Sequence, residues 1–150
     1  RDLVLGAHSA MSLNAVELIG AFFDVTYAYR FGPPSHDVTV VRLLDPETGD
    51  LLADAFHFPL GHSQARQPSE LSAGLLEGET GGWMLELETD RLLTSVTIAC
   101  PGYLPADNGF HLAPCVKRRI ALAPGPDTDS GVRPSGTVTA LNRTGSAGFR

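Results

Sequence analysis

In the stretch from Trp83 to Glu88 (WMLELE), every second residue is a large apolar one, and the two glutamates lie at the positions between them. Successive side chains of a β-strand point to opposite faces. Trp83, Leu85 and Leu87 therefore share one face, while the glutamates share the other. One apolar face and one charged face are typical of a strand that is buried on one side only. This stretch predicts a half-buried β-strand.

Short segments of the same kind recur along the chain, separated by glycine and proline. The others run over residues 37–44, 51–58, 96–100, 110–112, 116–122 and 137–141. Between the first two lies Asp45-Pro46-Glu47-Thr48-Gly49, where proline presets the turn dihedral and glycine supplies a positive φ, so we expect a hairpin. Seven or so short strands between turn signals predict an all-β chain folded as an antiparallel β-sandwich.

Residues 12–23 (SLNAVELIGAFF) break this pattern. Ser12 is a suitable helix N-cap, no proline interrupts the segment, and the apolar residues Val16, Ile19 and Phe23 are spaced for one helical face. We therefore predict a short helix, although these residue types also suit strands. Residues 24–30 either extend that helix or begin the first long strand, and their periodicity does not separate the two.

Composition bounds the class of protein. The chain has 150 residues, of which 43% are hydrophobic and 19% charged, so it is long enough to bury a core and wholesale disorder is ruled out. Its formal net charge of −6 argues against nucleic acid as a partner, because phosphate binding needs a surplus of Lys and Arg. No apolar run approaches the roughly 20 residues of a membrane helix, so we expect no membrane partner.

The chain begins at Arg1, and no signal-peptide pattern follows it. We expect a piece cut from a longer polypeptide, whose compartment stays open with the cytoplasm favoured. The two cysteines, Cys100 and Cys115, are too few for a disulfide scaffold or a four-cysteine zinc site. The sequence leaves open whether they are free or bridged to each other.

No catalytic constellation emerges from the sequence. Glu86 and Glu88 share a face, as a glycosidase pair would, but that face is the solvent side and lacks the burial that raises the pKa of an acid catalyst. There is neither a nucleophile elbow nor a phosphate-binding glycine loop. Five histidines lack metal-ligand spacing: His8, His36, His57, His62 and His111. We predict no catalytic residue, no cofactor and no metal ion.

Aromatic rings are the remaining candidates for binding, since sugar-binding modules stack flat rings on pyranose faces. Trp83 is expected in the core, because it lies on the apolar side of its strand. Tyr103 lies in an irregular loop from Pro101 to Pro105, and it is the ring that we predict for sugar stacking. Asn142-Arg143-Thr144 fits the N-glycosylation pattern, which has meaning only in a eukaryotic secretory protein.

Two stretches resemble segments of one enzyme family. Asp107 to Pro114 (DNGFHLAP), followed by the basic and apolar strand from Val116, resembles the S-D-N-x-F-x-L-x-P-G-E turn near the C-terminus of β-mannosidases of glycoside hydrolase family 2. Tyr27 to Pro34 (YAYRFGPP) is similar to a Y-A-Y-R-F-G-P-P segment of the same enzymes. Residues 136–142 (GTVTALN) are similar to the closing strand of the family, so the resemblance spans residue 21 to about residue 141.

The resemblance implies an immunoglobulin-like β-sandwich of about seven to nine strands, behind the catalytic (β/α)8 barrel of an enzyme that hydrolyses terminal β-mannosyl residues. Residues 1–20 are then a lead-in, residues 21–141 the sandwich and residues 142–150 a mobile tail. Neither catalytic glutamate of the family has a matching motif here. We expect a non-catalytic accessory domain whose partner is the barrel of the same chain. The alternative is a carbohydrate-binding module that docks on mannan-type polysaccharide.

The aromatic segment is expected to fix this domain against its barrel, with core and corner positions as the alternative for its tyrosines. The residues concerned are Tyr27, Tyr29, Arg30 and Phe31.

One turn departs from the pattern of the family. Cys115 stands where the family has glycine, and Val116 replaces its glutamate. Because cysteine takes a positive φ only at a steric cost, we expect another geometry for this turn.

Overall fold

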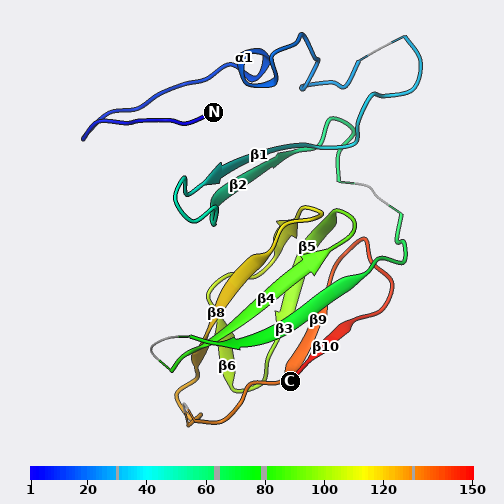
Figure 1. Cartoon of the computed structure of the whole chain (residues 1–150). Coiled ribbons are helices and arrows are strands. Elements are labelled where there is room, and N and C mark those ends of the chain that lie inside the picture. Colours follow the sequence, from blue (N-terminus) through cyan, green and yellow to red (C-terminus); the bar gives the residue numbers. More distant parts are fainter. Residues whose placement is uncertain (30, 63–64, 79–80, 130) are drawn as a thin grey trace. The chain divides into compact units, whose positions relative to one another are not determined.

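A computed structural model of the chain describes residues 1–29, 31–62, 65–78, 81–129 and 131–150. The fold divides into two compact units, Arg1–Ser63 and Gln64–Arg150 (Figure 1). The boundary falls inside the range expected for the sandwich, so the strands of that expected sandwich are split between the units. The predicted hairpin belongs to the first unit, and the other predicted strands belong to the second.

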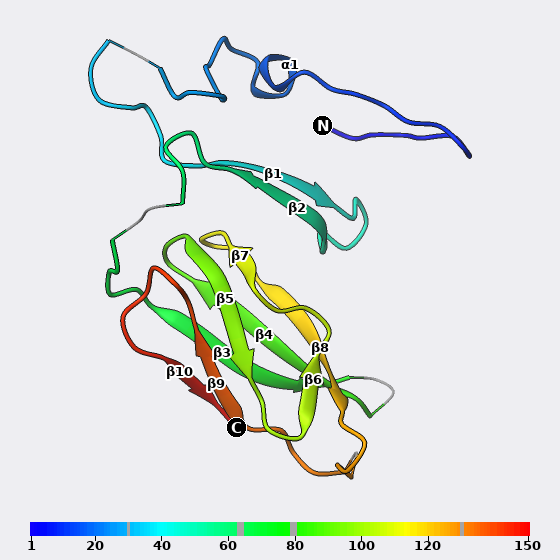
Figure 2. The same cartoon turned by 180° about the vertical axis from the view of Figure 1, so that it is seen from behind.

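The second unit is a β-sandwich of two four-stranded sheets, in which the paired strands are antiparallel (Figure 1, Figure 2). One sheet consists, in spatial order, of β3 (Leu71–Glu77), β4 (Trp83–Thr89), β8 (Arg118–Pro124) and β6 (Tyr103–Pro105). The other consists of β10 (Ala147–Phe149), β9 (Gly136–Thr139), β5 (Leu93–Ala99) and β7 (Phe110–Leu112).

Apart from β7, which pairs with β5 at the edge of its sheet and follows β6 in the chain, these strands have the order of an immunoglobulin sandwich. In chain order, β3, β4 and β8 occupy the places of strands A, B and E, and β6 lies beside β8 at the place of strand D. Strands β5, β9 and β10 occupy the places of C, F and G. The prediction of an all-β, antiparallel β-sandwich is confirmed. Over the described residues, this unit has the eight strands shown in its two sheets, within the seven to nine expected.

The core of the second unit is built from the apolar faces that the alternation predicts. On β4, Leu85 and Leu87 are buried and Trp83 packs against them as a partly buried ring. On β5, Val96 and Ile98 belong to the same cluster. Burial of one large aliphatic side chain contributes roughly 1.5–3 kcal/mol. All thirteen buried members of this cluster lie in the second unit, which therefore has a core of its own.

The end of the chain forms part of the sandwich. The expectation of a mobile tail does not hold for residues 147–149, which form β10 and pair with β9. Phe149 is buried in the core cluster, and its apolar surface stabilises the strand that carries it.

The described residues of the first unit form one short helix and one hairpin. The helix α1 (Ala15–Ile19) is shorter than predicted, because the side chain of Asn14, and not that of Ser12, caps its N-terminus, and Gly20 ends it with a φ of 75°. Residues 24–29 form neither a strand nor an extension of the helix. Strands β1 (Thr39–Leu44) and β2 (Leu51–His57) pair antiparallel as the predicted hairpin.

The turn between β7 and β8 keeps the geometry that glycine would favour. Cys115 has a φ of 58°, and its N–H donates to the Thr89 carbonyl at 3.0 Å. The expectation of another turn geometry is therefore wrong, since the hydrogen bond to β4 holds the cysteine in the left-handed region. Cys115 is exposed and Cys100 is buried, and both thiols are free.

We expect Cys115→Gly to raise the free energy of unfolding by about 1 kcal/mol, because glycine adopts this φ without the steric cost of a Cβ. Urea unfolding followed by Trp83 fluorescence measures the change. Cys115→Ala is the control, because it removes the thiol and keeps the Cβ, so its stability should match that of the parent chain. An equal gain in both variants would place the effect in the thiol instead of the backbone.

Candidate docking surface

The aromatic loop, defined as residues 22–29 together with residue 31, is organised by one carboxylate. Asp24 Oδ1 accepts hydrogen bonds from the N–H groups of Thr26 and Tyr27, and its Oδ2 accepts one from Tyr29, each at 3.1 Å. The Tyr27 N–H is the largest cause that lowers the pKa of Asp24, so the carboxylate stays ionised and keeps its three bonds. Residues 24–29 therefore form a compact loop without a strand or a helix.

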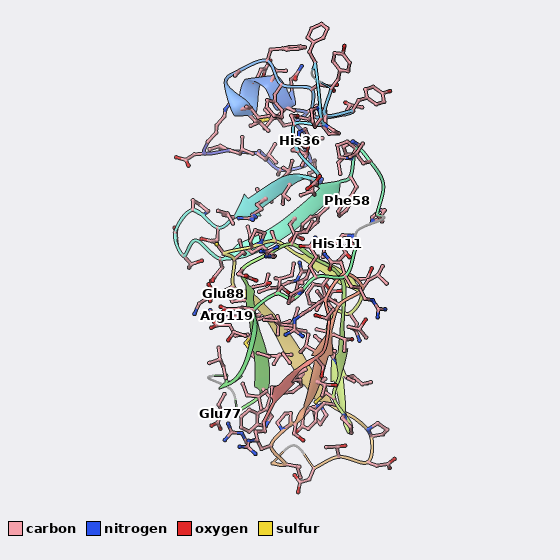
Figure 3. The ribbon with its side chains drawn as sticks, turned by 90° about the vertical axis from the view of Figure 1, so that its right-hand side faces the viewer. His36, Phe58, Glu77, Glu88, His111 and Arg119 are labelled. Atoms are coloured by element: carbon pink, nitrogen blue, oxygen red, sulfur yellow. The ribbon has the colours of Figure 1, made fainter. Side chains whose placement is uncertain are left out.

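Ala28 and His57 fasten the loop to the hairpin of the same unit. Ala28 is buried with a φ of 55°, and its carbonyl accepts from the Ser35 N–H at 3.1 Å. His57 Nε2, on β2, donates to the Thr26 carbonyl at 2.8 Å. His36, labelled in Figure 3, bonds Ser35 through Nδ1 and Thr39 of β1 through Nε2. The loop is thus held at its Thr26 and Ala28 carbonyls.

The rings of this loop are exposed. Tyr27 is 75% exposed, Tyr29 68% and Phe31 97%, and Phe22 is exposed as well. The Tyr29 and Phe31 rings meet edge to face with centroids 6.0 Å apart. Core positions for the two tyrosines are therefore excluded, and Arg30, the fourth residue predicted for docking, lies outside the described residues. Clustered rings on a fastened loop are typical of a surface that binds a partner.

An open groove of about 630 Å³ lies beside these rings, within the first unit. Its lining combines apolar side chains, among them Val16, Phe22 and Phe23, with the polar residues Asn14 and Asp24. Such a surface offers both ring faces and hydrogen-bond acceptors to a ligand.

Tyr103 does not present its ring to solvent. It is 5% exposed in the core of the sandwich, and its hydroxyl donates to the Val132 carbonyl. The prediction of sugar stacking by Tyr103 is therefore wrong, because strand β6 turns the ring inward instead of leaving it in a loop. Trp83 is partly buried against the core, as expected, and the Arg133 guanidinium lies 5.7 Å from the centre of its ring system.

The two glutamates of β4 lie on its solvent face, as the alternation predicts. Glu86 accepts from Lys117 Nζ at 2.9 Å and from Arg119 Nε at 3.1 Å. The hydrogen bond from Lys117, and then that from Arg119, lowers the pKa of Glu86, which is the opposite of what an acid catalyst requires. Figure 3 shows Glu88 and Arg119 on the same side of the sandwich. This pair of carboxylates is not arranged for acid–base catalysis.

We expect Glu86→Gln to lower the free energy of unfolding by less than about 1 kcal/mol at pH 7, since the ion pairs are near the surface. Because the pKa of Glu86 is lowered in the folded state, its contribution is present above the usual pKa of 4.5 and is lost as the pH falls through the folded-state value. Urea unfolding at pH 7, 5 and 3 should show the difference shrinking with pH. Glu88→Gln is the control, and an equal loss in that variant would contradict the role of the two cations.

The side chains of the turn before β7 make their contacts within the sandwich. Asn108 Oδ1 accepts from the Ile98 N–H at 2.9 Å, and its Nδ2 donates to the Ile98 carbonyl at 3.1 Å, so the side chain pairs with β5 like a short strand. Asp107 Oδ2 accepts from Arg118 Nη2 at 2.7 Å. The Arg118 guanidinium lies 4.3 Å from the centre of the Phe110 ring. These residues join β5, β7 and β8.

Asn142 fastens the end of β9 to the β4–β5 turn. Its Oδ1 accepts from the Thr94 N–H at 2.8 Å, and its Nδ2 donates to the Leu92 carbonyl at 2.9 Å. The amide that a glycan would occupy is therefore engaged in the fold. The residue pattern did not indicate this role for Asn108 or Asn142. The local sequence of a turn asparagine does not distinguish a side chain that bonds within the turn from one that bonds across the sheets.

No group of three or more His, Cys, Asp or Glu side chains in the described part of the chain is arranged to hold a metal ion. Over the same residues, no helix has the length and apolar character needed to cross a bilayer. A scan of protein-family models finds no match to this chain, and searches of curated proteins and of solved structures find none either.

Proposed function

We propose that these residues form a non-catalytic accessory domain of a β-mannosidase-like glycoside hydrolase, which packs against the catalytic barrel and stabilises it. The observation that carries the proposal is the aromatic loop, in which Tyr27, Tyr29 and Phe31 are exposed although the loop itself is fastened by Asp24 and His57. Holding exposed rings in place reduces the entropy lost when they bind a second surface.

Two further observations support this role. Residues 107–110, on which the family resemblance partly rests, hold the sandwich together: Asn108 bonds β5, and Asp107 and Phe110 contact Arg118 of β8. The Glu86 carboxylate of β4 is paired with the cations of Lys117 and Arg119 on the outer face of its sheet. A domain with these features acts by packing its surface against a neighbouring domain and stabilising it. Contacts between domains typically bury roughly 600–1,500 Å².

Hydrolysis of an aryl β-mannoside tests the proposal. We expect turnover by the full parent polypeptide, none by residues 1–150 alone, and loss of activity or thermal stability when these residues are deleted. Triple substitution of Tyr27, Tyr29 and Phe31 by serine in the full chain should reproduce part of that loss. Turnover by residues 1–150 alone, or a full chain without β-mannosidase activity, would overturn the proposal.

The second candidate function is a carbohydrate-binding module, and the groove beside Tyr29 is the observation that favours it. Exposed rings next to Asn14 and Asp24 are the chemistry that a short manno-oligosaccharide would need. Calorimetric titration of residues 1–150 with mannohexaose, repeated on Tyr29→Ala, separates the two functions. Heat that disappears in the variant would favour sugar binding, whereas no heat in either chain favours the accessory domain.

A further inference from the structure

Exposed apolar side chains are distributed very unevenly over the described residues. Of the twenty-one large apolar side chains that are exposed, seventeen lie in the first unit and four in the second. The four in the second unit are Leu76, Leu104, Val132 and Leu141. Scattered apolar residues on a surface are ordinary, but a concentration of this kind marks a surface that is covered by a partner.

The hairpin of the first unit has one exposed apolar face that a partner could bury. Val41 pairs with Ala55 and Leu43 with Ala53, so these four side chains share one face of the two-stranded sheet. All four are exposed. A two-stranded hairpin is marginally stable in water unless one of its faces packs against something else. This face is therefore a second apolar patch, in addition to the aromatic loop.

Charge is divided as unevenly as apolar surface. Residues 1–63 carry three Arg and eight Asp or Glu, a formal net charge of −5, whereas residues 64–150 carry eight Lys or Arg and nine Asp or Glu, a net charge of −1. The first unit is thus both apolar on its surface and strongly acidic. Complementary charge favours binding of a basic surface, and like charge opposes binding of a second copy.

From these observations we propose that the first unit is a docking arm, and that its occupant is a protein surface of the same parent polypeptide with an apolar centre and a rim of Lys and Arg. This inference rests on the proposed accessory function and adds the chemistry of the surface against which the domain packs. The aromatic loop and the Val41 face of the hairpin bury apolar area, while the net negative charge of residues 1–63 favours a basic partner surface.

Hydrogen–deuterium exchange of the full parent polypeptide, compared with residues 1–150 alone, tests this inference. The sandwich serves as the internal reference, because its core lies wholly within the second unit. We expect backbone amides of residues 14–29 and 39–57 to exchange at least about ten-fold more slowly in the full polypeptide, as burial of an arm against a partner requires. Raising NaCl from 50 to 500 mM should reduce that protection several-fold, since the rim contacts are screened.

Matched variants of the full polypeptide distinguish the loss of a charged or apolar contact of the first unit from a general loss of stability, with hydrogen exchange as the measurement. Glu47→Lys should speed exchange in the first unit by about three-fold, while Glu77→Lys, the same change in an exposed residue of the sandwich, should leave it unchanged. Phe31→Ser should have a larger effect than Leu104→Ser, which removes an exposed apolar side chain from the second unit.

Three results would overturn the inference. Equal protection in the full polypeptide and in residues 1–150 would mean that no outside surface covers the arm. Protection that is unchanged or strengthened by salt would exclude a basic occupant. A dimer of residues 1–150 in sedimentation at 50 mM NaCl would make a second copy the occupant. A full polypeptide that lacks β-mannosidase activity but shows the salt-sensitive protection would overturn the enzyme assignment alone.

Discussion

Gly136→Ala is expected to destabilise the sandwich by at least about 3 kcal/mol and to prevent folding in a less stable background. A Cβ at residue 136 would lie inside the van der Waals radius of the Ala99 carbonyl oxygen and 2.9 Å from Phe149 Cζ. The first contact is with the backbone of β5, which pairs with β9, and the second is with a buried ring. The β5 carbonyl cannot retreat without disturbing the pairing of β5 with β9, and the ring is packed in the core.

Gly148→Ala is the matched control for this prediction. Residue 148 pairs with β9 next to the Phe149–Gly136 pair, but the nearest atom to a Cβ there is the Gly136 oxygen at 3.9 Å, an ordinary contact. We expect a change within about 0.5 kcal/mol. Thermal unfolding of the two variants measures the difference, and equal stability would contradict the close approach of β9 to β5.

Asn142→Ala is expected to lower the free energy of unfolding by about 2 kcal/mol, because it leaves the Thr94 N–H and the Leu92 carbonyl without the partners that the amide supplies. Asn142→Asp should recover only part of the loss. Its carboxylate can accept from Thr94 but places an oxygen where Nδ2 donated to Leu92. Urea unfolding at pH 7 gives both values.

Thr144→Ala distinguishes this structural role from glycosylation. It removes the Asn-x-Thr pattern and leaves the Asn142 amide in place, and the Thr144 backbone N–H still donates to the Gln67 carbonyl. We expect its stability to equal that of the parent chain. If Thr144→Ala were as unstable as Asn142→Ala, the two hydrogen bonds of the amide would not be the cause.

Strand alternation predicted the sandwich because its core strands bury one face only. On β4, Leu85 and Leu87 lie in the core and Trp83 packs against it, so the apolar phase of the strand is unbroken, while Met84 shares the other face with the glutamates. Strand β3 (Leu71–Glu77) was missed, although Leu71, Ala73 and Leu75 pack against the core, because Gly74 interrupts the pattern and a glycine in a strand reads as a break. Strand β10 is three residues long, too short for a period to be visible.

The candidate site was predicted only in part. The segment YAYRFGPP drew attention to Tyr27, Tyr29 and Phe31, which are exposed, but no pattern indicates that the Asp24 carboxylate shapes the loop around them. The opposite error concerns Tyr103. Glycine and proline on both sides suggested an exposed loop, yet three residues suffice for pairing with β8, and this pairing buries the ring. Tertiary contacts decide both cases, and local sequence does not contain them.

Alkylation of the two thiols can report the unfolding of the sandwich. Cys115 is exposed, so an alkylating reagent reaches its thiol in the native state without any opening of the fold. Burial shields Cys100 and raises its pKa, so its thiolate becomes available only when the sheets separate. After a pulse of iodoacetamide, the fraction of molecules that carry a second carbamidomethyl group, on Cys100, would therefore measure the fraction that has unfolded globally. The first group, on Cys115, would serve as the calibration of reagent and time.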